Sequence, residues 1–109
     1  MSQYLLVLTS VSDRKAGQKI AAGLVEEKLA ACVTISALGK SFYWWDDKIT
    51  EDEEFVLFIK TKKELYSRVE KRILELHPYE LPEVIAVPLS KGYWKYLDWI
   101  DKELKDSES

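Results

Sequence analysis

Apolar residues recur along the chain with two different periods, and these periods divide it into strands and helices. Residues 4–8 form a continuous apolar run, which is typical of a strand covered on both faces. Ser12 and Asp13 then offer side-chain oxygens for a helix N-cap, and apolar residues recur at helical spacing through residues 20–29. The pattern therefore predicts a first strand followed by a first helix.

The next part of the chain predicts a long hairpin. Residues 32–45 are rich in β-branched and aromatic types, and residues 49–61 form a second β-prone run. Two arms of roughly 13 or 14 residues would each reach about 45 Å at the rise of a strand, whereas the first and last strands are about half as long. We therefore expect this hairpin to overhang its own sheet.

Four consecutive aromatic residues, 42–45, lie at the distal end of the first arm. Because neighbouring side chains of a strand point to opposite faces, they place large apolar groups on both faces of the hairpin. Trp44 and Trp45 would then point apart, one toward the core of its own subunit and the other toward a neighbour. We therefore expect a homo-oligomer with Tyr43, Trp44 and Trp45 in the interface between subunits.

The second half of the chain begins with a predicted helix. Thr61 and Glu64 have the spacing of a capping box, in which each side chain bonds a backbone N–H at the start of the helix. Residues 65–76 follow with apolar side chains on one helical stripe. Pro78 stops the helix, because proline has no N–H to donate and its ring clashes with the preceding turn.

The last elements are a strand and a helix. Residues 84–87 form an apolar run typical of a buried strand, and Pro88 marks its end because proline cannot donate a ladder hydrogen bond. Apolar residues are again helical in period through residues 93–104. The order is βαββαβ with an additional C-terminal helix, which is the α+β, ferredoxin-like arrangement of an antiparallel sheet. We expect residues 1–109 to form a single domain, with 105–109 as a flexible tail.

The composition limits the partners of this domain. Apolar residues make up 47% of its 109 residues, enough to bury a core without disulfides or a structural metal. The 16 basic and 19 acidic residues are scattered, so no basic stripe favours nucleic acid. A single cysteine, Cys32, fits a reducing compartment, and residues 4–8 are too few to cross a membrane. We therefore expect a cytoplasmic protein that neither inserts into membranes nor binds nucleic acid.

The densest group of chemically active side chains lies in the proline-stiffened residues 77–83. It carries an imidazole, a phenol and two carboxylates, which can ligate a divalent ion or polarise a bound molecule: His77, Tyr79, Glu80 and Glu83. One alternative gives His77 only a structural role, with its side chain bonded to the last carbonyls of the second helix. Glu80 and Glu83 could form a general acid and base pair, or they could be solvated loop carboxylates.

Other candidate residues are less specific. Lys60 could bind an anion, or its stem could lie along the sheet edge with the ammonium in water. Cys32 is expected to be a small buried side chain, since no base stands beside it. The aromatic residues lack the basic signature of RNA-recognition domains. An acylphosphatase-like enzyme would need a glycine cradle near Arg14, and the sequence has none there.

Six short stretches, spread over almost the whole chain, match the motifs of one known family in the same order. They are residues 29–33 (LAACV), 43–45 (YWW), 48–49 (KI), 60–61 (KT), 77–83 (HPYELPE) and 96–99 (YLDW). In this combination the sequence closely resembles the divalent-cation tolerance protein family, CutA.

The resemblance implies a ferredoxin-like subunit in a tight homotrimer, whose long hairpin arms form the sheet between subunits. It also implies a role in tolerance to copper and other divalent cations, and a signalling role similar to that of the PII trimers. Two positions depart from the family. Thr9 stands where some members have a cysteine proposed as a metal ligand, which removes a thiolate site there. Asp47 stands where the hairpin turn often has glycine, but aspartate can still adopt a left-handed conformation.

We therefore expect a trimeric, non-enzymatic protein that binds a divalent cation, copper(II), and no organic cofactor. His77 and Glu80 are the expected ligands, because imidazole with carboxylate suits copper(II) better than copper(I), which prefers sulfur. The alternative is a PII-like structural or signalling trimer that binds a small metabolite or a partner protein in the clefts between subunits. For that alternative, Lys60, Tyr79 and Glu83 are the candidate cleft residues.

Overall fold

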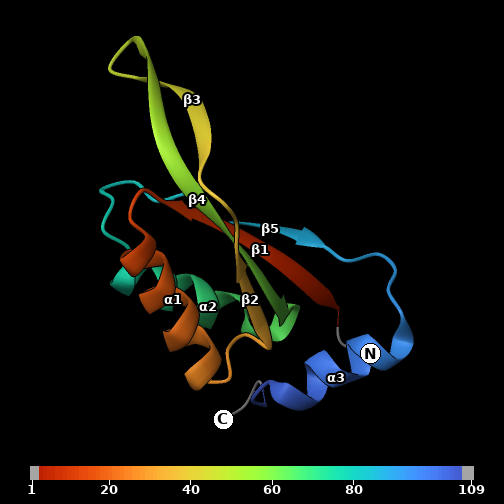
Figure 1. Cartoon of the computed structure of the whole chain (residues 1–109). Coiled ribbons are helices and arrows are strands. Elements are labelled where there is room, and N and C mark those ends of the chain that lie inside the picture. Colours follow the sequence, from red (N-terminus) through yellow and green to blue (C-terminus); the bar gives the residue numbers. More distant parts are fainter. Residues whose placement is uncertain (1–2, 107–109) are drawn as a thin grey trace.

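A computed structural model describes residues 3–106, and these form an antiparallel sheet with helices packed around it (Figure 1). The elements follow in the order β1 (Tyr4–Val11), α1 (Arg14–Glu26), β2 (Cys32–Ile35), β3 (Gly39–Trp45), β4 (Lys48–Lys62), the 3-10 turn η1 (Lys63–Leu65), α2 (Tyr66–Leu76), β5 (Ile85–Pro88) and α3 (Trp94–Glu103). Asp13 caps α1 as predicted, since its carboxylate accepts the Lys15 N–H at 3.3 Å. The predicted element order is confirmed.

The strand order in the sheet is β2-β4-β1-β5, and every pairing is antiparallel. Val7 of β1 lies between Ile59 of β4 and Ala86 of β5. The long strand β4 therefore pairs with β1 over its second half and with β3 at its beginning. This topology confirms the predicted α+β, ferredoxin-like class and leaves β2 and β5 at the two edges of the main sheet.

Helices α1 and α2 cover one face of the sheet, and the core lies between them (Figure 1). Because side chains alternate across a strand, the odd-numbered residues of β1 and β4 face this core. The core residues with no exposed surface include Val7, Val11, Leu57, Ile59, Ile20, Leu24, Val69 and Ile73. These residues hold β1 and β4 in place, and the pocket described below depends on the position of both strands.

The opposite face of the sheet is open near β5. Leu6 and Leu8 of β1 point to it and pair with Val87 and Ile85 of β5. Ile85 is 52% exposed and Val87 is 46% exposed. The prediction that residues 84–87 are buried is therefore wrong for the single chain, because α1 and α2 both lie on the other face.

The predicted capping box at Thr61 and Glu64 is also wrong. Thr61 belongs to β4 and is fully buried, and its hydroxyl donates to the Leu29 carbonyl at 2.7 Å. A buried hydroxyl must find an acceptor, and the turn after α1 supplies it. The chain instead enters α2 through η1, and neither N-cap makes a side-chain hydrogen bond. Helix α2 does end before Pro78, as predicted.

The hairpin overhangs the sheet as predicted, but its first arm is divided (Figure 1). Residues 36–38 interrupt the arm between β2 and β3. Ser36 donates its N–H to the Val56 carbonyl at 2.9 Å and accepts the Val56 N–H on its hydroxyl at 2.8 Å. A side-chain oxygen thus replaces one ladder acceptor, and the chain bends there.

The hairpin turn accommodates aspartate without difficulty. Asp46 and Asp47 have φ angles of 50° and 63°, the left-handed values that a two-residue turn between strands favours. Just before the turn, Trp44 is 70% exposed and Trp45 is 44% exposed. The expectation that one of the two points into its own core is therefore wrong for the single chain, because the hairpin projects beyond the helices.

Helix α3 packs at the end of the sheet where β4 finishes. Ile100 and Leu104 are buried there, and the Asp101 carboxylate forms an ion pair with Lys62 Nζ at 3.5 Å. These contacts fix the chain after β5 against the rest of the domain.

The predicted flexible tail, residues 105–109, is only partly described. The Lys105 N–H donates to the Lys28 carbonyl at 2.9 Å, so the start of this segment is attached to the turn after α1. Residues 107–109 lie outside the described part of the chain. Among the helices within residues 3–106, none is long and apolar enough to span a membrane.

Candidate functional site

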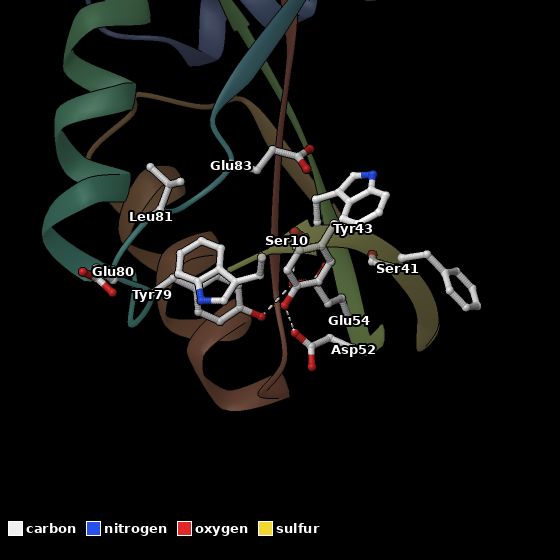
Figure 2. Close-up of a pocket in the computed structure, with 12 residues that line it drawn as sticks. Ser10, Ser41, Tyr43, Asp52, Glu54, Tyr79, Glu80, Leu81 and Glu83 are labelled. Atoms are coloured by element: carbon white, nitrogen blue, oxygen red, sulfur yellow. Dashed lines mark hydrogen bonds between the residues drawn. The ribbon is translucent and has the colours of Figure 1, made fainter. Parts of the chain in front are cut away.

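A pocket of about 650 Å³ lies between the hairpin and the loop that follows α2 (Figure 2). Its walls come from β1, the aromatic end of β3, two acidic residues of β4 and the loop at residues 77–83. The lining residues are Ser10, Ser41, Phe42, Tyr43, Trp44, Trp45, Asp52, Glu54, Tyr79, Glu80, Leu81 and Glu83. The pocket therefore joins the aromatic hairpin to the acidic loop, two regions that the sequence pattern indicated separately.

The register of the hairpin explains why two acidic residues of β4 face the pocket. Ser41 pairs with Asp52, and Gly39 pairs with Glu54. The side chains of Ser41, Asp52 and Glu54 therefore share one face of the hairpin. Tyr43 lies on the same face, and its hydroxyl donates a hydrogen bond to the Asp52 carboxylate (Figure 2). This hydrogen bond, with desolvation and the charge of Asp52 adding to it, raises the pKa of Tyr43.

Glu54 is the most buried acidic side chain of the pocket, with 8% of the residue exposed. Its Oε2 accepts the Tyr79 hydroxyl at 2.7 Å and the Ser10 hydroxyl at 3.4 Å. Burial raises the pKa of Tyr79 to about 12; a hydrogen bond with Ser12 acts against this, and the hydrogen bond to Glu54 acts with it. Tyr79 therefore stays protonated at neutral pH and donates to Glu54, which keeps further lone pairs as an acceptor.

His77 holds the loop in place through both ring nitrogens. Its Nδ1 accepts the Tyr79 backbone N–H at 3.2 Å, and its Nε2 lies 2.8 Å from the Ser10 carbonyl oxygen. Because Nδ1 accepts, Nε2 must carry the proton of the neutral ring and donate to Ser10. Burial lowers the pKa of His77, and the bond to Ser10 and the charge of Glu54 oppose this effect.

This arrangement bears on both interpretations of His77. Only its backbone N–H bonds α2, at the Ile73 carbonyl over 2.8 Å, while its side chain bonds β1 rather than the last carbonyls of the helix. The structural alternative is therefore wrong about the hydrogen-bond partner of the His77 side chain, which is the Ser10 carbonyl and not a carbonyl of α2. For the ring to ligate an ion, Nδ1 must first release the N–H of Tyr79.

The other predicted loop residues reach the pocket. Tyr79, Glu80 and Glu83 all line it. Glu80 and Glu83 are exposed, and their carboxylates point in different directions from the loop (Figure 2). This geometry favours solvated carboxylates over a general acid and base pair.

Lys60, the remaining cleft candidate, does not line the pocket. Its Nζ donates to the Tyr96 hydroxyl at 3.0 Å, and Tyr96 stacks on Trp99 with ring centroids 5.6 Å apart. That hydrogen bond raises the pKa of Lys60, and desolvation opposes the shift. Cys32 is partly exposed and stands opposite Lys60 in the sheet. Lys60 therefore belongs to a separate cluster with α3.

The pocket does not contain a complete metal site. Within residues 3–106, no three His, Cys, Asp or Glu side chains are grouped closely enough to hold one ion. Thr9 is fully buried and does not line the pocket. Its hydroxyl has no hydrogen-bond partner among the described residues. The available donors are carboxylate oxygens, which suit harder cations. An ion bound here would need water or another subunit to complete its ligands.

The sequence pattern did not single out four residues of the pocket: Ser10, Ser41, Asp52 and Glu54. Residues 51–54 are consecutive acidic residues, and alternation already places positions 52 and 54 on one face. That signal could have identified a negatively charged face of the hairpin. Its meeting with Tyr79 depends on strand register and on the path of the loop, which the local pattern does not specify.

The chain is similar to proteins named for divalent-cation tolerance. The CutA1 divalent ion tolerance protein family matches residues 5–103. The divalent-cation tolerance protein CutA of Thermus thermophilus is 40% identical over 95 residues, which cover 87% of this chain and 92% of that protein. Protein CutA 1, chloroplastic, of Oryza sativa subsp. japonica is 38% identical over 103 residues, which cover 94% of this chain and 58% of that protein. The chain thus spans little more than half of the rice relative.

Solved structures agree with this match. The structure of CutA1 from Oryza sativa has a TM-score of 0.92 at 36% identity and covers 95% of both chains. The structure of the divalent cation tolerance protein Cut A1 from Thermus thermophilus has a TM-score of 0.91 at 37% identity, covering 94% of this chain and 99% of that one. The family match, the sequence identities and the shared fold all extend over most of the chain. The chain therefore belongs to the CutA1 divalent ion tolerance protein family.

Proposed function

We propose that the chain forms a homotrimer that binds divalent cations, copper(II) among them, and so contributes to metal tolerance. The observation that carries this proposal is the presence of four carboxylates around one pocket: Asp52, Glu54, Glu80 and Glu83. Among the described lining residues, none is a lysine, an arginine or a histidine. Negative charge of this kind attracts cations, and the relatives are named for divalent-cation tolerance.

The ligands follow from the chemistry of the loop. Glu80 is exposed and supplies a carboxylate oxygen, and water or a neighbouring subunit completes the coordination. His77 adds a nitrogen ligand when Nδ1 exchanges the Tyr79 N–H for the ion. Copper(II) gains more from imidazole than manganese(II), which is suited by carboxylate and water. Because a chain supplies so few ligands, we expect weak binding.

The trimer is supported by apolar surfaces that the single chain leaves open. One is the open sheet face beside β5, with Ile85 and Val87. The other is one face of the hairpin, where Trp44 pairs with Ile49 beside Phe42 and all three are more than half exposed. A closed ring of identical subunits buries such surfaces without leaving one unpaired.

The predicted interface residues divide between this surface and the pocket. Trp44 lies on the outer face of the hairpin with Phe42, whereas Tyr43 and Trp45 alternate with it and share the face of Asp52. We propose that all three remain near the boundary between subunits. The pocket would then lie beside a neighbouring subunit rather than far from it.

Calorimetric titration of demetallated protein with copper(II) and with manganese(II) tests the cation proposal. Glu80→Gln should weaken the binding of both ions, whereas Glu103→Gln, an exposed carboxylate on α3, should leave it unchanged. His77→Gln should weaken copper(II) and spare manganese(II). Absence of saturable binding, or equal binding by all of these proteins, would contradict the proposal.

The pocket also favours a second function, that of a PII-like trimer binding a small metabolite or a partner protein. Its volume of about 650 Å³ is within the range of small-molecule sites, and aromatic side chains form part of its walls. Tyr79 and Glu83 are its candidate ligand residues, whereas Lys60 lies in another cluster. In both functions we propose binding without catalysis, in the cytoplasm, where a single unpaired cysteine is stable.

A further inference from the structure

We propose that the pocket binds an aliphatic polyamine, a flexible chain of methylene groups that carries several ammonium groups. This inference deepens the second proposed function, small-molecule binding at the same pocket, and rests on it. It depends on a combination that a metal site does not need: carboxylates from two elements together with aromatic side chains in one pocket.

The charge of the pocket selects a cation. Asp52 and Glu54 face it from β4, and Glu80 and Glu83 face it from the loop. The lining residues in the described chain include no basic side chain to offset them. An anion would meet uncompensated negative charge, whereas a cation is complementary to the whole lining.

The aromatic walls select an organic cation. Tyr43 and Trp45 line the pocket from the face of β3 that Asp52 shares, and Tyr79 lines it from the loop. An aromatic face attracts an ammonium group through its quadrupole, most strongly for tryptophan, and it also removes methylene groups from water. A metal ion would bind through oxygen ligands and gain little from these walls. The ligand should therefore carry both charge and apolar surface.

The placement of the carboxylates selects more than one charge. Asp52 lines the pocket from β4 and Glu83 lines it from the loop, so its carboxylates come from two different elements. The Tyr43 hydroxyl also holds the Asp52 carboxylate, and the Tyr79 hydroxyl holds Glu54 in the same way. Carboxylates from two elements in one pocket with aromatic side chains suit ammonium groups at separate points along one chain, with the methylene groups over the rings.

Titration of the full chain with spermidine, at constant ionic strength, tests this inference by calorimetry and by tryptophan fluorescence. Asp52→Asn should raise the dissociation constant for spermidine about fivefold, because one partly exposed charge pair contributes about that much to affinity. Glu53→Gln is the matched control, because it removes the same charge from the neighbouring residue on the opposite face of β4. It should bind spermidine as the wild type does.

A second pair of variants tests the aromatic walls. Trp45→Leu should weaken spermidine binding about threefold to tenfold through the lost cation–π contact. Trp94→Leu, at an exposed tryptophan of α3 outside the pocket, should leave the affinity unchanged. Circular dichroism and sedimentation of each variant establish that the fold and the assembly are retained. Asp52→Asn tests the inference independently if Trp45→Leu does not assemble.

The competing outcomes are distinct. Equal weakening by Glu53→Gln and Asp52→Asn would show general attraction by net charge and overturn the inference. Choline binding as tightly as spermidine would show a site for a compact, singly charged cation, which also overturns it. Saturable binding of a neutral or anionic metabolite instead would overturn the polyamine and keep the small-molecule function. Absence of saturable spermidine binding by the wild type, with copper(II) binding present, would overturn the inference and leave the cation proposal standing.

Discussion

The Tyr79 hydroxyl donates to Glu54 Oε2 over 2.7 Å, and this hydrogen bond joins the loop after α2 to the hairpin strand β4. Without it, the buried Glu54 carboxylate would keep only the longer bond from the Ser10 hydroxyl, at 3.4 Å, among its side-chain partners described here. Leaving a buried charged acceptor short of a donor is costly. Tyr79→Phe should therefore lower the free energy of unfolding by about 1.5 to 3 kcal/mol.

A matched control for this prediction is Tyr66→Phe. Tyr66 donates to Glu70 at 3.0 Å, one turn along α2, so the same chemical group is removed from a local pair. A pair of this kind contributes about 0.2 to 0.5 kcal/mol. Urea unfolding followed by circular dichroism measures both variants. Equal losses would show that the burial of Glu54 gives its hydrogen bond no special weight.

Stability should fall as the pH drops through the titration range of His77. Burial lowers the pKa of this residue in the folded chain below its ordinary value of 6.5. The unfolded chain then binds the proton more readily than the folded chain, so the contribution is complete above 6.5 and is lost as the pH falls below it. His77 is the only histidine of the sequence, so no other imidazole contributes in this window.

Urea unfolding at pH values from about 8 to about 5 measures this dependence, and His77→Gln should flatten the slope near the histidine range. Nuclear magnetic resonance of the imidazole C–H groups gives the pKa of the folded chain directly. A measured value at or above 6.5 would contradict the prediction and the effect attributed to burial.

The order of elements was predictable because each element has a strong apolar period. The predictions that were wrong, such as the helix cap at Thr61, depend on contacts between residues distant in sequence. The Thr61 hydroxyl finds the Leu29 carbonyl, 32 positions away, in place of a local cap. Ser36 takes over the N–H of Val56, which divides an arm that is continuous in residue type. The apolar pattern of residues 84–87 predicts a strand, which β5 confirms, but it does not specify whether the same chain covers that strand.

The candidate site was predictable only in part, because some of its contacts join residues that are distant in sequence. Prolines and polar side chains mark residues 77–83 as a loop with chemistry, and Tyr79 and Glu83 do line the pocket. The partner of the His77 ring, the Ser10 carbonyl, is 67 positions away on β1. Asp52 shares a face with Tyr43 because of the strand register of the hairpin. The contribution of Asp52 and Glu54 to the pocket could therefore be identified only from the structure.

Assembly should depend on the exposed side of β5. Ile85 and Val87 lie on the open sheet face, and a lysine there would place an unpaired charge in the proposed interface. The wild type should sediment at three times the chain mass of 12.7 kDa. The double variant Ile85→Lys with Val87→Lys should sediment near the mass of one chain at the same concentration.

Leu74→Lys is the matched control for this last prediction. Leu74 is 51% exposed on α2, on the side of the sheet opposite to the open face, so the variant makes the same chemical change at a surface outside the proposed interface. It should leave the sedimenting mass unchanged.

Because association stabilises a folded subunit by mass action, the midpoint of thermal unfolding should rise with protein concentration for the wild type and for Leu74→Lys. The double variant should lose that dependence, since its subunits unfold alone. A wild type that stays monomeric at micromolar concentration would contradict the trimer, and a trimeric double variant would show that the interface lies elsewhere.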